Sequence, residues 1–123
     1  MTGILIFGAS GQLGSEILAS SLGKDERLIV APRALRFVES DAVASYVKQQ
    51  RPELIVNAGA MTDVDAAHLD PDRALKVNGL APGVLAGVAQ EVGARVIHIS
   101  SEAVYDGSTQ VPYKEVDTCR PVS

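Results

Sequence analysis

The sequence is poor in several residue types, and each shortage excludes a class of protein. Cys119 is the only cysteine among 123 residues, so no internal disulfide can form and a reducing compartment is expected. No apolar run approaches the roughly 20 residues that cross a membrane. The apolar start "GILIF" is too short for a signal peptide and lacks a basic flank. We therefore expect a cytoplasmic protein with no membrane partner.

Basic residues are also in short supply. Eleven Lys and Arg stand against 15 Asp and Glu, which gives a net charge of -4 and a pI of about 5.0. This balance argues against nucleic acid as a partner. The two histidines, His68 and His98, belong to no cluster with metal-ligand spacing, so no metal is predicted. We expect His68 to be solvated and His98 to be a hydrogen-bonded core residue.

Short apolar runs alternate with helical patterns along the chain. Runs typical of buried strands are present, and they lie at 4–7, 27–31, 53–58 and 94–100, with a possible short strand at 35–38. Helical patterns occupy the intervals, at 11–22, after a cap at Ser40, and at 71–92 before a C-cap at Gly93. The tail after Gly107 has weak periodicity and is predicted to be loop.

Continuous apolar strands separated by helices are typical of a parallel sheet covered on both faces. Right-handed crossovers then predict an α/β, doubly wound fold of the Rossmann type, here in truncated form. The length of 123 residues fits one domain. We expect residues 1–123 to be an incomplete dinucleotide-binding domain without a substrate domain.

Three glycines mark the junction of the first strand and first helix. "GASGQLG" places Gly8, Gly11 and Gly14 in a G-x-x-G-x-x-G spacing. A dinucleotide site needs a tight turn, close backbone approach to the pyrophosphate and a helix N-terminus aimed at the phosphates. We predict that this turn binds the cofactor together with the intervening residues Ser10, Gln12 and Leu13. The absence of G-K-[ST] argues against a phosphate-transferring loop.

The second strand bears on which dinucleotide binds. An acid about 20 residues after the glycines would hold a ribose 2′-hydroxyl. Here Arg33 stands 19 residues after Gly14, and no acid lies between Arg27 and Val38. We predict that Arg33 and Arg36 hold a 2′-phosphate, so that NADP(H) is favoured over NAD(H). The alternative is that both are solvated loop residues.

Four blocks in order resemble the extended short-chain dehydrogenase/reductase family, and within it the branch of dTDP-4-dehydrorhamnose reductases. The blocks are "ILIFGASGQLG", "RPELIVNAGAMTDVDAA", "ALKVNGLAPGVLAGVAQEVGARVIHISSEAVYDG" and "PYKEVD". The resemblance implies NADP(H)-dependent reduction of the 4-keto group of a dTDP-6-deoxy sugar. It also implies a nucleotide-sugar substrate.

The resemblance also implies roles for particular residues. Cofactor contacts are expected along the tip of the strand at 53–58, from Ala58, Gly59 and Ala60, and from Phe37. Ser101 would hold the catalytic hydroxyl, which polarises the substrate carbonyl for hydride attack. The alternative is that Ser100 and Ser101 satisfy backbone groups at a strand end. Substrate contacts are expected from Val64, Glu102 and Ala103, although family members usually carry an acid and an aromatic at the last two positions.

Asn78 is the second catalytic candidate. Pro82, four residues on, has no N–H, so a continuous helix would leave the Asn78 carbonyl without its usual partner and would kink. The resemblance implies that this carbonyl faces a water in the proton relay. The alternative is a helix that breaks near Gly79 and starts again.

The family's general acid, the tyrosine of Tyr-x-x-x-Lys, has no match. Four residues after Tyr105 and Tyr113 stand Thr109 and Asp117. We therefore interpret the chain as the N-terminal, cofactor-binding part of a reductase and expect no turnover from it alone. The alternatives are a non-catalytic Rossmann binding module and a nucleotide-sugar epimerase or dehydratase. We also expect an exposed sheet edge to pair with another chain, such as a second copy.

Overall fold

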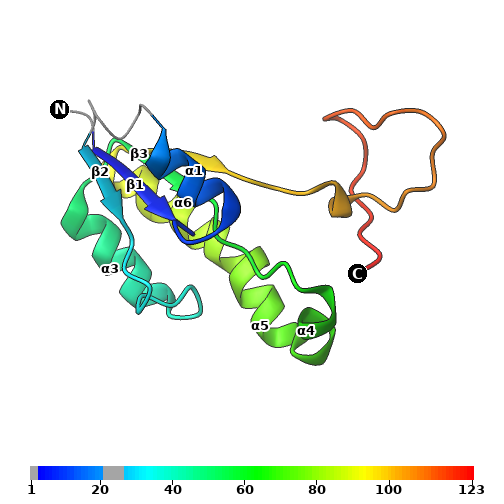
Figure 1. The fold of residues 1–123 in the computed structure, drawn as a ribbon, viewed down its shortest axis with the longest axis horizontal. Helices are drawn as coiled ribbons and strands as arrows, with labels where there is room; N and C mark the ends of the chain where they lie inside the picture. Colours follow the sequence, from blue (N-terminus) through cyan, green and yellow to red (C-terminus); the bar gives the residue numbers. More distant parts are fainter. Residues whose placement is uncertain (1–2, 21–26) are drawn as a thin grey trace.

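Four parallel strands form the centre of the molecule. A computed structural model describes residues 3–20 and 27–123. The strands are β1 (Gly3–Phe7), β2 (Arg27–Val30), β3 (Leu54–Asn57) and β4 (Arg95–His98), in the spatial order β2-β1-β3-β4 (Figure 1). The chain moves outward from β1 to β2 and then crosses back to β3 on the other side of β1. This reversal confirms the doubly wound α/β fold and places a switch point between β1 and β3.

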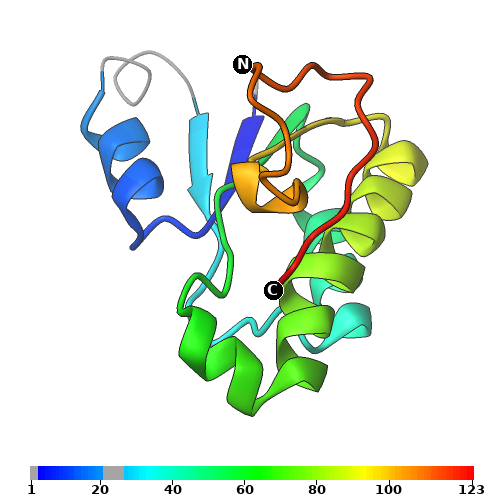
Figure 2. The same cartoon turned by 90° about the vertical axis from the view of Figure 1, so that its right-hand side faces the viewer.

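Helices cover both faces of the sheet, as predicted. Helix α1 (Gln12–Ala19) lies on one face, and α3 (Ser40–Gln50) and α6 (Ala81–Val92) lie on the other (Figure 2). Alternate strand residues serve the two faces, because successive side chains of a strand point in opposite directions. Leu5, Phe7 and Ile55 pack against α3 and α6, whereas Ile4, Ile6 and Val56 pack on the α1 side.

The helical layers explain the apolar stripes in the sequence. Val43 and Val47 of α3 and Leu85 and Val88 of α6 are buried in the same cluster. Lys48 joins the two helices at the surface through a 2.7 Å ion pair with Glu91. Helix α1 is shorter than the predicted 11–22, since it ends at Ala19, and residues 21 and 22 lie outside the described part of the chain.

The long helix predicted at 71–92 is continuous but not uniform. It follows α4 (Val64–Leu69) and consists of α5 (Pro71–Ala74), a π-helical segment (Leu75–Leu80) and α6. The N–H of Ala81 donates to the carbonyl of Lys76, five residues back. The wider turn lets the helix pass Pro82, which has no N–H, without a break. The alternative of a break near Gly79 is therefore wrong.

The predicted short strand at 35–38 is also wrong. Two tight turns occupy this region, in which Leu35 N–H donates to the Pro32 carbonyl and Glu39 N–H to the Arg36 carbonyl, both at 2.9 Å. The apolar residues that favoured a strand are partly buried, from a turn instead. Phe37 stacks on Phe7 with ring centroids 5.2 Å apart. Burial alone does not distinguish the two arrangements.

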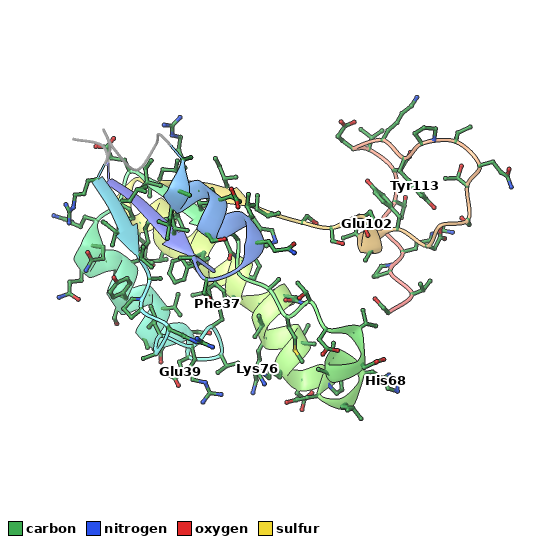
Figure 3. All side chains as sticks on the ribbon, viewed as in Figure 1. Phe37, Glu39, His68, Lys76, Glu102 and Tyr113 are labelled. Carbon is green, nitrogen blue, oxygen red and sulfur yellow. The ribbon has the colours of Figure 1, made fainter. Side chains whose placement is uncertain are left out.

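The last part of the chain leaves the body as an arm. After β4 it forms one 3-10 turn (Glu102–Val104) and then loop, as predicted for the tail after Gly107 (Figures 1 and 3). Tyr105 and Tyr113 stack at 4.2 Å, and Arg120 N–H donates to the Val104 carbonyl at 2.8 Å. The arm therefore has its own internal contacts. Within residues 3–20 and 27–123, no helix is long and apolar enough to cross a membrane.

Candidate cofactor-binding site

The glycine turn lies at the switch point, where β1 and β3 end side by side. Gly8 has a φ of +78°, and a Cβ added to it would lie 2.4 Å from the Gly59 nitrogen and 2.5 Å from the Ala58 carbonyl carbon. Real Cβ atoms do not come so close, so only glycine can occupy this position. The tip of β3 therefore presses directly on the turn.

Gly14 lets the first helix approach the turn. Its added Cβ would lie 2.2 Å from the Gly8 carbonyl oxygen, whereas one on Gly11 would meet that oxygen at 3.4 Å, an ordinary contact. Gly11 N–H donates to the same oxygen at 3.0 Å and closes the turn. Gly8 and Gly14 thus allow the tight turn and the close helix approach that the spacing predicted, whereas the side-chain space at Gly11 does not require glycine.

The N-terminus of α1 is open to an anion. No side chain caps it, and no acidic residue stands in its first turn. The first N–H groups of a helix have no partner within the helix and carry the positive end of its dipole. Ser10, Gln12 and Leu13 are exposed there, while Gly14 is buried. These groups fit the pyrophosphate of a dinucleotide.

Asn57 fixes the backbone at the tip of β3. Only 1% of this residue is exposed, and it is the one polar residue in the core of the described part of the chain. Its Oδ1 accepts the Gly59 N–H at 3.1 Å, and its amide nitrogen donates to His98 Nδ1 at 3.1 Å. The predicted hydrogen bond of His98 is confirmed, but its predicted burial is wrong because β4 is the edge strand and His98 is exposed.

Phe37 connects the tip of β3 to the turn that follows β2. A Cβ on Gly59 would lie 2.5 Å from Phe37 Cε2. The ring therefore packs against the backbone at Gly59, within the predicted cofactor segment of Ala58, Gly59 and Ala60. Ala60 is exposed beyond it. This packing brings the glycine turn, the 58–60 segment and the 33–38 turn together.

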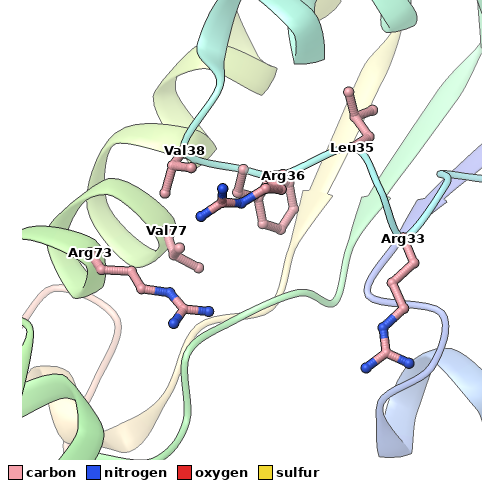
Figure 4. Close-up of a pocket in the computed structure, with 7 residues that line it drawn as sticks. Arg33, Leu35, Arg36, Val38, Arg73 and Val77 are labelled. Carbon is pink, nitrogen blue, oxygen red and sulfur yellow. The ribbon is translucent and has the colours of Figure 1, made fainter.

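Beside Phe37 lies a pocket of about 230 Å³ (Figure 4). Its lining combines three arginines with apolar side chains, namely Arg33, Arg36 and Arg73 with Leu35, Phe37, Val38 and Val77. The predicted Arg33 and Arg36 thus both line this open pocket, and Figure 4 shows their guanidinium groups apart from one another. Arg73 was not predicted, because no local pattern in the sequence connects α5 with the turn after β2.

Asn78 bridges the π-helical segment to the loop after β3. Its Oδ1 accepts the Met61 N–H at 2.8 Å, and its Nδ2 donates to the Met61 carbonyl at 2.9 Å. These two bonds hold the chain just beyond the 58–60 segment. The sequence pointed to the backbone carbonyl of Asn78 and did not predict these side-chain bonds. No local pattern could have predicted them, because Met61 lies 17 residues away in the chain.

Ser101 lies on the arm, away from the glycine turn. Its Oγ donates to Glu102 Oε2 at 3.0 Å and accepts the Ala103 N–H at 3.1 Å, so it caps the 3-10 turn. Ser101, Glu102 and Ala103 are all exposed, and Val64 is 65% exposed at the start of α4. Figure 3 shows Glu102 on the arm, well apart from Phe37 in the body. The predicted substrate residues therefore do not form one pocket with the cofactor residues.

Two side chains of the arm have displaced pKa values. The hydroxyl and N–H of Ser108 and the phenol of Tyr113 donate to Asp106 and lower its pKa to about 2. Partial desolvation and nearby acids raise the pKa of Tyr105 above its ordinary value. Tyr105 is therefore a poor proton donor near neutral pH. In the described residues no three His, Cys, Asp or Glu side chains are grouped to hold a metal.

A glycine turn at the switch point of a doubly wound sheet, with an open helix N-terminus above it, is typical of the Rossmann fold. The family model described as the RmlD substrate binding domain matches residues 1–123. The chain belongs to this family.

Two relatives support the assignment to this family. The dTDP-4-dehydrorhamnose reductase of Burkholderia thailandensis is 38% identical over 120 residues, which cover 98% of this chain and 40% of the relative. The structure of such a reductase from Clostridium acetobutylicum superposes with a TM-score of 0.91 at 36% identity, covering 98% of this chain and 43% of that one. The chain thus spans about 40% of the length of the relatives it matches.

A second solved structure contains a cofactor. The dTDP-4-dehydrorhamnose reductase of Bacillus anthracis, in complex with NADP, has a TM-score of 0.90 at 27% identity and covers 99% of this chain and 44% of that one. The resemblance to the reductase branch is therefore confirmed at the level of family and fold.

Proposed function

We propose that this chain binds NADP(H) and forms the cofactor-binding part of a cytoplasmic reductase that acts on a dTDP-4-keto-6-deoxy sugar. Bound NADPH would supply the hydride for such a reduction. The glycine turn and the N-terminus of α1 would hold the pyrophosphate. Ala58, Gly59 and Ala60 would lie along the dinucleotide, and Arg33 and Arg36 would hold the 2′-phosphate.

The observation that carries this proposal is the contact between Gly8 and the tip of β3. An added Gly8 Cβ would lie 2.4 Å from the Gly59 nitrogen, so the turn and the tip of β3 are in backbone contact next to the uncapped end of α1. Such a turn is what close approach of a pyrophosphate requires. The arginine pocket lies on the side of the sheet where β2 ends, which is the ribose end of a dinucleotide in this fold.

The preference for NADP(H) is tested by Arg33→Ala. Loss of a charge-assisted hydrogen bond to the 2′-phosphate is expected to raise the Kd for NADPH about tenfold, while the Kd for NADH changes by less than about twofold. Fluorescence titration with both dinucleotides measures the ratio. An unchanged NADPH:NADH affinity ratio would show that Arg33 is a solvated loop residue.

Ser101 is proposed to polarise the substrate carbonyl. Its hydroxyl now donates to Glu102, so it would exchange this bond for one to the substrate oxygen. In the reductase that carries this chain, Ser101→Ala is expected to lower kcat about 100-fold or more without changing the Kd for NADPH. Ser100→Ala is the matched control and should retain kcat. Equal effects of the two substitutions would contradict the assignment.

A further inference from the structure

We propose that Arg73 is a third specificity-determining residue, which closes the arginine pocket from α5 and contacts the 2′-phosphate of NADP(H). The inference rests on the proposed function and deepens it, since it adds a residue from a distant segment to the same phosphate site. The ligand it implies is an adenosine that carries a phosphate on its 2′-oxygen.

The pocket is built by two segments that are far apart in the chain. The 33–38 turn forms one wall, and Arg73 with Val77 forms the opposite wall (Figure 4). The guanidinium groups of Arg36 and Arg73 point toward one another across the space between these walls. An anion bound there would be reached from both sides.

The charges of the pocket are unbalanced. No carboxylate lies within 4.0 Å of the guanidinium groups of Arg33, Arg36 or Arg73 among residues 3–20 and 27–123, where the one ion pair is that of Lys48 with Glu91. Asp70 lies close to Arg73, but its Oδ1 accepts the backbone N–H of Arg73 as the cap of α5. The guanidinium groups of Arg36 and Arg73 face a common space and repel one another, and a bound phosphate would replace that repulsion with charge-assisted hydrogen bonds.

The rest of the lining is apolar. Leu35, Phe37, Val38 and Val77 supply carbon surface beside the three guanidinium groups. A free inorganic anion would use only the charged part of this pocket. A planar base joined to a phosphate would use both parts, because arginine binds phosphate in a bidentate manner and apolar side chains accept the face of a ring. A 2′-phosphoadenosine group would therefore contact more of the lining of this pocket than phosphate alone.

The test compares two nucleotides that differ at the 2′-oxygen. The probes are 2′,5′-ADP, which carries the 2′-phosphate and lacks the nicotinamide half, and 5′-AMP. Isothermal titration calorimetry measures both Kd values for the unaltered protein and for Arg73→Leu, Arg73→Lys and Lys76→Ala. Lys76 is the matched control, since it removes one positive charge from the same helix and is outside the pocket lining. Arg73 is exposed, so circular dichroism should show unchanged folding.

The proposal expects a loss that is specific to the 2′-phosphate. Arg73→Leu should weaken 2′,5′-ADP about tenfold and 5′-AMP by less than about twofold, with partial recovery in Arg73→Lys. Lys76→Ala should leave both Kd values within about twofold. Equal weakening of both probes by Arg73→Leu, or the same loss in Lys76→Ala, would overturn the proposal. Failure of the unaltered protein to bind NADPH would instead overturn the proposed function.

Discussion

At the scale of single residues, Gly8 and Gly87 occupy opposite environments. Gly8 has a positive φ and faces the backbone of Ala58 and Gly59, so a methyl group there meets atoms that cannot move aside. Gly87 lies in the middle of α6, is exposed, and would meet nothing within 4 Å. The first is required by the site, whereas the second only lowers helix propensity.

Alanine substitution should change the free energy of unfolding in opposite directions at Gly8 and Gly87. Gly8→Ala is expected to lower the free energy of unfolding by about 3 kcal/mol, because it adds both a clash and a strained φ. Gly87→Ala should raise it by about 0.5–1 kcal/mol. Urea denaturation followed by circular dichroism measures both. A Gly8→Ala variant as stable as the original would contradict the packing of β3 on the turn.

Arg73 lines the arginine pocket in the structure, although the sequence did not predict it as a site residue. The prediction of Arg33 and Arg36 followed from a known distance along the chain after the glycines. Arg73 enters the same pocket from α5 only because the crossover from β3 to β4 returns over that end of the sheet. A local pattern cannot register such a contact.

At the scale of elements, the π-helical segment sets how the long helix meets the loop after β3. Its wider turn accommodates Pro82 and carries Asn78, whose side chain makes both bonds to Met61. π-Helical turns are rare and frequently occur at functional sites. Here the segment holds the backbone of Met61, which follows the proposed cofactor segment 58–60.

Asn78→Ala is expected to release this loop. Loss of two partly exposed hydrogen bonds should lower the free energy of unfolding by about 1 kcal/mol and weaken NADPH binding by a few fold. Thermal denaturation and fluorescence titration measure the two effects. Asn78→Asp keeps the bond from the Met61 N–H but loses the donor to the Met61 carbonyl. Its stability and NADPH affinity should therefore fall between those of the original chain and Asn78→Ala. No change in either quantity would show that the side chain does not position the loop.

The arm contains a second element whose contacts depend on charge. The bonds from Ser108 and Tyr113 hold the pKa of Asp106 at about 2, below its ordinary value of 3.8. Because the folded pKa is lowered, these bonds stabilise the arm fully above pH 3.8 and are lost as the pH falls through about 2. Both tyrosines stack nearby, so their NMR ring signals report the change.

We expect those ring signals to shift with a midpoint near pH 2 in the original chain. Asp106→Asn should remove that titration and leave the signals insensitive to pH between 4 and 2. Asp63→Asn provides the matched control, because the Asp63 carboxylate caps α4 through the Ala66 N–H, outside the Asp106 network. An Asp106 midpoint near 3.8 would contradict the hydrogen-bond network.

At the scale of the whole molecule, β4 is the outer strand of the sheet that the described residues form, and its apolar side chains are half exposed. Ile97 and Ile99 are 50% and 44% exposed on and just after this strand. Unpaired strand edges with apolar side chains favour association with another chain. Ile97 and Ile99 therefore define the surface through which we expect the chain to pair with another chain.

Ile97→Lys is expected to reduce self-association. A charged side chain on an edge strand opposes pairing with another edge. Multi-angle light scattering at several concentrations should show a lower average mass for this variant. Leu69→Lys is the control, since Leu69 is 84% exposed at the end of α4 and away from the edge. An average mass unchanged by Ile97→Lys would exclude this edge as the contact surface.

The sequence by itself determined the elements whose signals are local. The glycine turn, the parallel α/β order and the two-faced burial of β1 followed from spacing and periodicity, because residues a few positions apart share a turn or a face. The resemblance to the reductase branch rested on four such blocks and is confirmed.

The tertiary structure decided what depends on residues distant in the chain. Phe37 packs against the core from a turn and not from a strand, and the apolar pattern of the sequence is the same in either case. His98 is exposed because β4 is the edge of the sheet. The bond of Asn78 to Met61 and the entry of Arg73 into the pocket arise from packing between segments. Periodicity records whether a residue is buried, but only the fold determines which distant residue it meets.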